Sequence, residues 1–371
     1  MAAYTTIDNP ELFFQCKLYT GNSAHYITGD SQAITLDGSE NMQPDLVWIK
    51  SRTQGGVGYN GNHCLFDSVR GTTKFFFGNE TTVEQTQSGV TAFSTDGFTV
   101  GPYDMMNDTG DSFVAWCWKA GTAFSNDASA TSVGNTDSSG SASSTAGFSI
   151  SKYAGAGSSL DIVVKHGLSV KPAVMITKNI DDANNWAVYH HKNTSAPETD
   201  YLRLDTNNAT TDIATIWADT EPTSAVFTAG DHSSSNRSGD DFVSYHWNEV
   251  QGYSKFGSYV GTNSADPNFV YCGFKPAWIM IKESSGTGNW VMMDHKRIND
   301  SLSDSNNGNM VQLYANTTAV DDTDPYIYTT SNGFVNINAN SDTNASGETY
   351  TFMAFAESPL VNSNGVPNNA E

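Results

Sequence analysis

The sequence predicts an all-β protein made of three tandem β-sandwich or jelly-roll-like repeat units, each of about 100 residues. Two observations lead to this prediction. Four ordered sequence markers recur three times along the 371 residues. The apolar runs between Gly, Asn, Asp and Ser clusters are short, rich in β-branched and aromatic residues, and lack helical periodicity. The sandwich and the jelly roll both fit this pattern, so both alternatives stay open.

The four markers follow one another in the same order in each unit. The first is an aromatic-rich segment at 17–21, 152–155 and 258–261. The second is a proline followed by an apolar run ending in lysine, at 44–50 (PDLVWIK), 172–178 (PAVMITK) and 276–282 (PAWIMIK). The third is an Asn-led run at 62–67, 185–190 and 289–294. The fourth is a closing strand introduced by glycine, at 110–116, 239–245 and 347–353.

The spacing of the markers indicates a true repeat. From the marker proline to the closing glycine there are 66 residues (44 to 110), 67 residues (172 to 239) and 71 residues (276 to 347). The predicted organisation has repeat units at 1–120, 147–253 and 254–360. A Ser/Thr/Gly-rich linker or long loop is expected at 121–146, and a polar C-terminal tail that frays at 361–371.

The closing strand of each unit is expected to lie in the middle of a sheet. Alternate side chains of a strand point to opposite faces, and both faces are apolar here. In the first unit the two faces carry Phe113, Ala115 and Cys117, and Val114, Trp116 and Trp118. Each preceding glycine predicts a turn with positive φ. The lysines that end the second marker, Lys50, Lys178 and Lys282, are expected to be solvated strand ends.

Charge and composition exclude several classes of protein. The chain has 40 Asp and Glu against 18 Lys and Arg, a net charge of −22, which argues against binding to nucleic acid or to an anionic membrane. No apolar run approaches the roughly 20 residues of a transmembrane helix, and the N-terminus does not resemble a signal peptide. The four cysteines lack CxxC spacing and are expected to be free thiols.

Two groups of residues are candidates for binding. Asp321, Asp322 and Asp324 could supply three oxygen ligands to Ca²⁺, although the EF-hand spacing is absent and a solvated acidic loop is the alternative. Sugar sites combine a stacking aromatic ring with polar groups from loops, as small-molecule sites in general combine apolar walls with a few polar groups. The aromatic candidates in predicted loops are Tyr59, Tyr103, Tyr253 and Tyr326.

The sequence offers no arrangement typical of catalysis. Asp294 and His295 are adjacent on a predicted strand and therefore point to opposite faces, so they do not form a dyad. No nucleophile elbow, HExxH or Walker loop is present. We therefore expect a protein that is not an enzyme and has no cofactor other than the calcium considered above. A polysaccharide depolymerase stays an alternative, because paired glycosidase carboxylates have no fixed spacing in sequence.

Six motifs resemble a repeat domain of uncharacterised structural proteins of tailed bacteriophages, especially marine phages, often called fibre-like or lectin-like. They are 44–50, 66–71 (FDSVRG), 96–100 (DGFTV), 114–119 (VAWCWK), 252–259 (GYSKFGSY) and 354–359 (AFAESP). The resemblance covers nearly the whole chain and implies a virion protein made in the host cytoplasm. It transfers no catalytic or binding residue.

These observations favour a phage virion surface protein of the tail fibre or knob type that binds a host-surface glycan. The alternative is a capsid decoration or tail-assembly protein whose partners are other virion proteins. The repeat begins within about a dozen residues of the N-terminus and no heptads are present, which favours a compact appendage. Such appendages are commonly homotrimers, but three repeats in one chain could also replace threefold symmetry.

Overall fold

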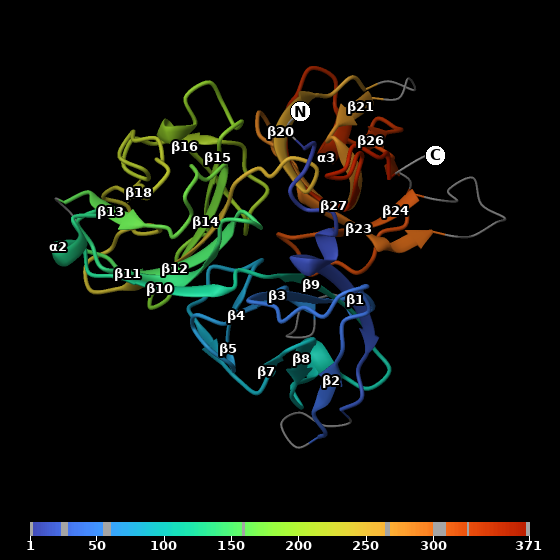
Figure 1. Ribbon diagram of the computed structural model, residues 1–371, viewed down its shortest axis with the longest axis horizontal. Coiled ribbons are helices and arrows are strands. Elements are labelled where there is room, and N and C mark those ends of the chain that lie inside the picture. The colour runs from blue at the N-terminus through green and yellow to red at the C-terminus, as the bar shows by residue number, and fades with distance from the viewer. Residues whose placement is uncertain are drawn as a thin grey trace.

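The computed structural model describes residues 3–23, 29–54, 61–157, 160–263, 268–299, 309–324 and 326–368. Within these ranges the regular structure is almost entirely β, and its named strand pairs are antiparallel. The strands fall into three groups in chain order, termed here the N-terminal, middle and C-terminal segments. Figure 1 shows the three segments as three lobes around a common centre. None of the helices described is long and apolar enough to cross a membrane.

The N-terminal segment contains two sheets. The larger has the order β1-β9-β3-β4-β5-β6 and the smaller β2-β8-β7. The larger sheet consists of β1 (Phe14–Thr20), β3 (Leu46–Ser51), β4 (Cys64–Asp67), β5 (Lys74–Phe77), β6 (Gln85–Thr86) and β9 (Ser112–Trp118). The smaller consists of β2 (Gln32–Ile34), β7 (Val90–Ser94) and β8 (Gly97–Val100). Two short helices accompany them, η1 (Pro10–Leu12) and α1 (Asp104–Asn107).

The middle segment has a larger sheet of order β10-β11-β12-β19-β14-β15-β16-β17 and the strand pair β13-β18. The larger sheet consists of β10 (Thr122–Asn126), β11 (Ser138–Ser143), β12 (Phe148–Ala154), β14 (Val174–Asn179), β15 (Ala187–His190), β16 (Asp200–Arg203), β17 (Thr211–Asp212) and β19 (Asp241–Trp247). The pair consists of β13 (Ile162–Lys165) and β18 (Val226–Ala229). The short helices are α2 (Ala128–Thr131) and η3 (Pro197–Thr199).

The C-terminal segment has the sheets β20-β27-β22-β23-β24 and β21-β26-β25. The larger consists of β20 (Ser254–Val260), β22 (Phe274–Glu283), β23 (Trp290–Asn299), β24 (Asn309–Tyr314) and β27 (Thr349–Pro359). The smaller consists of β21 (Asn268–Tyr271), β25 (Ile327–Thr330) and β26 (Gly333–Asn336), and α3 (Ser341–Asn344) precedes β27.

The larger sheets share one arrangement around the closing strand. The closing strands β9, β19 and β27 each lie between the first marker strand and the proline-led strand, as predicted for a central strand. Two further antiparallel strands follow the proline-led strand in every case. The glycines before the closing strands, Gly110, Gly239 and Gly347, have φ of 86°, 85° and 82°, which confirms the predicted turns.

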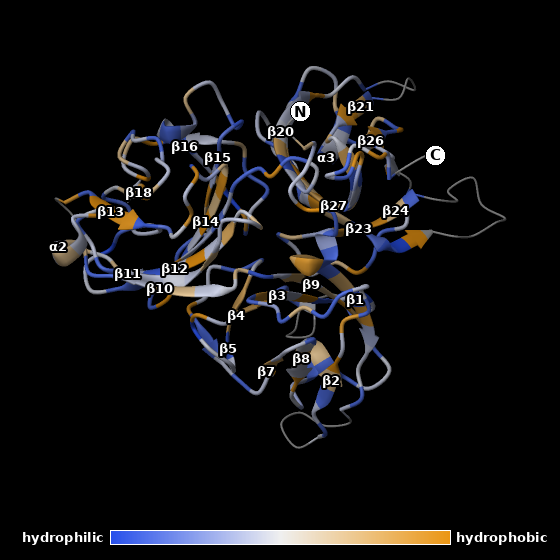
Figure 2. Cartoon of the chain, viewed as in Figure 1, coloured by the Kyte–Doolittle hydropathy of each residue, from blue (hydrophilic) through white to orange (hydrophobic). Residues whose placement is uncertain are grey.

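The two faces of each closing strand enter different cores. Phe113 and Ala115 of β9 pack in a core private to the N-terminal segment. Trp116 and Trp118, on the other face, belong to a core shared by all three segments. The middle and C-terminal segments also have private cores. In Figure 2 the hydrophobic colour runs along strands such as β14 and β27, which lie toward the centre. The larger sheets are therefore covered on both faces.

Two expected irregular stretches are folded. Residues 121–146 are not a linker, because β10 and β11 form a hairpin that extends the middle sheet beyond β12. Backbone pairing needs no large side chains, so a Ser-rich stretch can form strands. The C-terminal tail does not fray up to the last described residues: Val361 bridges to Pro367, and the Ser363 amide donates to Asp8 at 2.6 Å.

Candidate binding site at the joints between segments

Three joints hold the segments in a closed ring. The first joint lies between the N-terminal and middle segments, the second between the middle and C-terminal segments, and the third between the C-terminal and N-terminal segments. Each contains one equivalent backbone hydrogen bond: Glu84 N to Ile180 O (3.0 Å), Thr210 N to Ser284 O (2.9 Å), and Asp321 N to Arg52 O (3.1 Å). Because the third bond returns to the first segment, the ring closes.

A buried lysine lies at every joint. Lys50, Lys178 and Lys282 have no exposed surface, so the expectation that they are solvated strand ends is wrong. Each strand end is covered by the neighbouring segment, which the strand pattern alone cannot show. Lys178 donates across the first joint to Thr81 O at 2.9 Å, and Lys282 donates across the second to Asn207 O at 3.3 Å. Burial lowers the pKa of all three lysines to about 8.

A ring nitrogen from the third marker also crosses every joint. Trp186 Nε1 donates to Phe77 O at 3.1 Å, and Trp290 Nε1 donates to Arg203 O at 2.8 Å. At the third joint the equivalent residue is His63, whose Nε2 lies 3.0 Å from Tyr314 O. Burial lowers the pKa of His63 well below its ordinary value, so a neutral ring can donate to this carbonyl.

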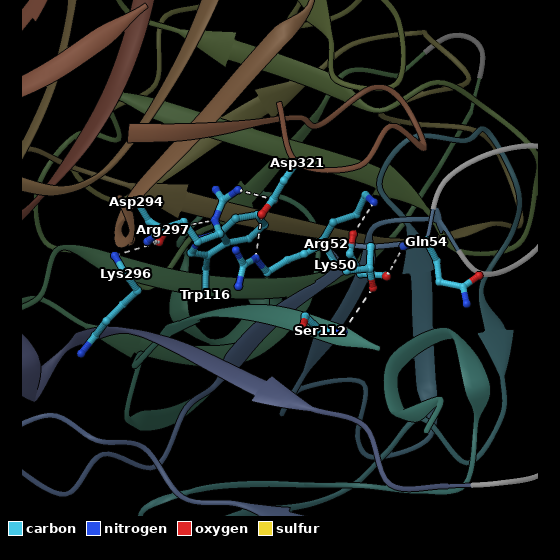
Figure 3. A network of polar contacts seen from close by, with 11 residues as sticks. Lys50, Arg52, Gln54, Ser112, Trp116, Asp294, Lys296, Arg297 and Asp321 are labelled. Carbon is cyan, nitrogen blue, oxygen red and sulfur yellow. Dashed lines mark hydrogen bonds and ion pairs between the residues drawn. The ribbon is translucent and has the colours of Figure 1, made fainter. Parts of the chain in front are cut away.

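An arginine–carboxylate network closes the third joint (Figure 3). Arg297 binds Asp294 at 2.7 Å and Asp321 at 2.9 Å, and Trp116 of the N-terminal segment donates to Asp294 at 3.0 Å. Arg52, also from the N-terminal segment, binds Asp321 at 2.8 Å. Burial by itself raises the pKa of Asp294, but the charge and hydrogen bonds of Arg297 outweigh it and leave that pKa below its ordinary value.

The first joint has the same network in equivalent positions. Arg70 binds Asp67 at 2.5 Å and Glu84 at 3.2 Å. Tyr245 of the middle segment donates to Asp67 at 2.7 Å, in the place that Trp116 occupies at the third joint. Both arginines are almost completely buried, and the carboxylates that they bind balance their charges within the joint.

The second joint lacks this ion pair. Asn193 occupies the position of Arg70 and Arg297, three residues after the third marker, and Thr210 occupies the position of Glu84 and Asp321. Thr210 Oγ1 donates to Asn193 Oδ1 at 2.7 Å, so the contact persists between two short uncharged side chains. A hollow of about 580 Å³ lies here, within the roughly 300–1,000 Å³ of small-molecule sites. Its lining residues are Lys192, Asn193, Thr194, Ala209, Thr210, Ser258, Ser284, Ser285 and Thr349.

A second hollow surrounds Phe124 on strand β10. Its volume is about 440 Å³, and its wall combines the rings of Phe124 and Phe13 with Ser143, Ser144 and other residues with small side chains. Cβ atoms at Gly140 and Gly167 would come within 2.8 and 2.5 Å of the Phe124 ring, so two glycines make room for it. A partly exposed ring beside hydroxyl groups is suited to stacking against a polar ligand.

Two of the four tyrosines expected to bind glycan are buried. Tyr103 is 6% exposed and packs against Phe75 in the private N-terminal core, while Tyr253 is 1% exposed and lies in the shared core. The expectation that these two rings are exposed is therefore wrong. Tyr103 is covered by its own segment, and Tyr253 is covered by residues of the shared core. Tyr326 is partly exposed and donates to Asp324 at 3.3 Å. Tyr59 lies outside the described residues.

The expected calcium site is not formed. Asp321 is bound by two arginines, Asp322 accepts a hydrogen bond from Tyr314 at 2.7 Å, and Asp324 accepts one from Tyr326. Within the described ranges, no three His, Cys, Asp or Glu side chains come together to hold a metal ion. The three carboxylates have protein partners instead.

The residues of the two hollows were not anticipated from the sequence. Three residues after the third marker, the first and third units have arginine (Arg70 and Arg297) and the middle unit has Asn193. A longer marker would have shown this difference, but no pattern indicates that Asn193 lies at a joint. Phe124 stood out only as a large apolar residue within a polar stretch. Both hollows depend on how segments and strands pack, which lies beyond sequence periodicity.

The fold and its joints define an all-β protein of several antiparallel sheets. The chain belongs to the family described as a domain of unknown function, DUF7483, which matches residues 9–359. The match takes in all three segments, so the family domain comprises them together. No curated protein and no solved structure matches the chain.

Proposed function

We propose that this protein works by binding, as a surface protein of a tailed-phage virion that attaches to a glycan of the host cell. We also infer that the three segments are three copies of one β-sandwich. The common order around the closing strands and the equivalent contacts at the three joints support this second inference. A ring of three sandwiches in one chain would serve as a compact head, in place of an intertwined fibre.

The observation that carries the glycan proposal is the hollow around Phe124. A pyranose ring has an apolar face of C–H groups and a rim of hydroxyls, so it is matched by an aromatic ring flanked by hydroxyl-bearing side chains. Phe124 is partly exposed, and Ser143, Ser144 and Thr145 line the same hollow. Strand β10 belongs to a hairpin that, among the strands the structure describes, extends the middle sheet alone, so this feature is not required by the shared arrangement.

The joints support a role in binding rather than catalysis. Residues that could serve as acids, bases or nucleophiles are used to hold the segments together: Asp294 pairs with Arg297, His63 bonds a carbonyl, and Lys178 is fully buried. The exposed surface is rich in hydroxyl and amide groups, which recognise sugars through hydrogen bonds.

A glycan array of bacterial surface polysaccharides tests the proposal directly. We expect the wild-type protein to bind a subset of glycans and Phe124→Ala to lose most of that affinity, because the stacking surface is removed. Leu160→Ala is the control, since Leu160 is a 65% exposed apolar residue that does not line this hollow. If the wild-type protein binds no glycan, or if Phe124→Ala binds as tightly as wild type, the proposed role of this hollow is wrong.

A second candidate function is assembly with other virion proteins. Phe269 and Tyr271 are about half exposed (48% and 53%) and lie two residues apart on strand β21, so both point to the same face of it. Exposed apolar side chains that cluster are typical of protein contacts. Gold-labelled antibody on intact virions separates the candidates: label on the tail favours the adhesin and label spread over the head favours decoration. Absence of label from intact particles contradicts a virion surface location.

A further inference from the structure

The second joint is the place where the ring departs from its own pattern. At the first and third joints an arginine spans the distance between two carboxylates, and its guanidinium fills the space beside the neighbouring segment. At the second joint the positions of these carboxylates hold His190 and Thr210, and the arginine is replaced by Asn193. Asparagine is shorter by several atoms, so the space is open.

A buried polar group without a partner lies beside the open space. Asn193 is 5% exposed, its Oδ1 accepts from Thr210, and its Nδ2 has no hydrogen-bond partner. A buried donor left unpaired costs free energy, and such groups in folded proteins usually have a partner. Nδ2 itself has almost no exposed surface, so an oxygen atom of a ligand in the hollow pairs with it, and recovers this free energy, when the Asn193 side chain turns toward the hollow.

Strand β20 adds backbone groups to the same hollow. Hydrogen bonds from Ala356 N to Tyr253 O and from Gly261 N to Glu348 O show that the odd-numbered residues of this strand bond to β27. The backbone N–H and C=O of Ser258 therefore point away from β27. Ser258 lines the hollow, and it lies on the edge strand of its sheet.

The chemistry of the lining selects the kind of ligand. Threonine and serine hydroxyls, which donate and accept, come from both segments, and Lys192 is the one charged side chain among the lining residues. A cationic ligand finds no carboxylate among the described lining residues, and Lys192, the cation that an anionic ligand would need, is exposed, so its attraction is weak and screened by salt. A neutral molecule rich in hydroxyl groups is matched by this mixture of donors and acceptors.

We propose that the hollow at the second joint is a binding site for one sugar residue, with Asn193 Nδ2 and the Ser258 edge donating to its oxygen atoms. This inference rests on the proposed glycan binding and adds a site separate from the Phe124 hollow. The sugar can be a free monosaccharide or a residue within a longer glycan. Binding to both hollows would give the head two points of attachment to host polysaccharide, which raises its avidity.

The arginine–carboxylate ion pair of the first and third joints provides the test. Asn193→Arg combined with Thr210→Glu should fill the hollow with an ion pair and reduce affinity for the hit glycan at least tenfold by isothermal titration. At the second joint the new arginine would meet His190 in place of an aspartate, so a second variant that needs no ion pair is also tested. Ser258→Tyr fills the hollow from an exposed position on strand β20. Phe124→Ala is tested beside them, and the melting temperature of each variant shows that it is folded.

The outcomes separate this inference from the function on which it rests. Loss of affinity in both hollow-filling variants, together with slowed hydrogen exchange of the Ser258 amide when the hit glycan is added, supports the site. Titration with the constituent monosaccharide, compared with the oligosaccharide, shows which source of the sugar is bound. Unchanged affinity in folded hollow-filling variants overturns the site while glycan binding stands. A wild-type protein that binds no glycan overturns both.

Discussion

Trp116 donates its indole N–H to the carboxylate of Asp294 at 3.0 Å, although 178 residues separate them in the chain. Trp116 lies on the closing strand of the N-terminal segment, and Asp294 ends the third marker of the C-terminal segment. The same carboxylate also holds Arg297, so one buried group serves both the fold of its own segment and the docking of another. The stability of the ring should therefore depend on this ion pair.

Removing Arg297 should be strongly destabilising. Arg297→Met leaves Asp294 buried without its counter-charge, which typically costs about 3–5 kcal/mol of unfolding free energy. The double variant Asp294→Leu, Arg297→Met should be less destabilised than the single one, because no isolated charge remains. Urea unfolding of the three proteins measures this difference. A single variant as stable as wild type would show that the pair does not support the third joint.

The buried lysines should matter more than exposed ones. Lys178→Met removes hydrogen bonds to Thr81 O and Asn184 O, at 2.9 and 2.7 Å, and leaves these carbonyls short of a donor. We expect a loss of about 1–3 kcal/mol. Lys152→Met is the matched control, since Lys152 is exposed and its ion pair with Asp241 is on the surface. Equal effects of the two substitutions in chemical denaturation would contradict a special role for the joint.

Stability should fall when the pH drops below about 6.5, the pKa of an unfolded histidine. Burial lowers the pKa of His166 to about 4 and that of His190 to about 3, and lowers those of His63 and His246 well below their ordinary value. The unfolded chain takes up protons below pH 6.5 that the folded chain does not. Unfolding is therefore favoured as the pH falls, and full stability is present above pH 6.5.

Each such histidine contributes a slope of about 1.4 kcal/mol per pH unit between its two pKa values. Urea midpoints at pH 7.5, 6.5, 5.5 and 5.0 measure the total slope, and His166→Gln should reduce it. His295→Gln is the control, because that side chain is partly exposed. A midpoint that stays constant over this range would show that the buried histidines do not control acid stability.

A single segment should not fold alone. The inner face of the N-terminal sheet carries Trp116 and Trp118, which pack in the core shared with the other segments. A fragment of residues 1–120 would expose this face to water, so we expect it to aggregate or to lack a cooperative unfolding transition. The full chain, with all three joints satisfied internally, should have a native mass near 40.0 kDa. A cooperatively folded fragment would contradict this dependence on the shared core, and a trimeric full chain would contradict the expected mass.

The local elements of the fold could be read from the sequence. Apolar residues on both faces of the closing strand of the first unit mark it as central, and β9, β19 and β27 all lie between two other strands of their sheets. Gly110, Gly239 and Gly347 adopt the predicted positive φ because other residues are strained there. The all-β class follows from short runs bounded by turn residues.

The candidate site could not be read in the same way. Lys50 and Tyr253 look like surface residues in their local context, and both are buried because another segment covers them. Residues 121–146 have the composition of a linker, yet they pair as strands because β12 offers a free edge. Asp321 resembles a metal ligand until Arg52 and Arg297 are placed beside it.

The strands of the markers, the turns before the closing strands and the repeated order of the markers follow from the amino-acid sequence, because they depend on residues close together in the chain. Only the tertiary structure decided which polar groups are buried, which joints are closed by arginine and where the hollows at Asn193 and Phe124 lie. These features depend on contacts between residues that are not neighbours in the chain, such as Trp116 and Asp294, which are 178 positions apart. Local periodicity carries no information about such distant pairs.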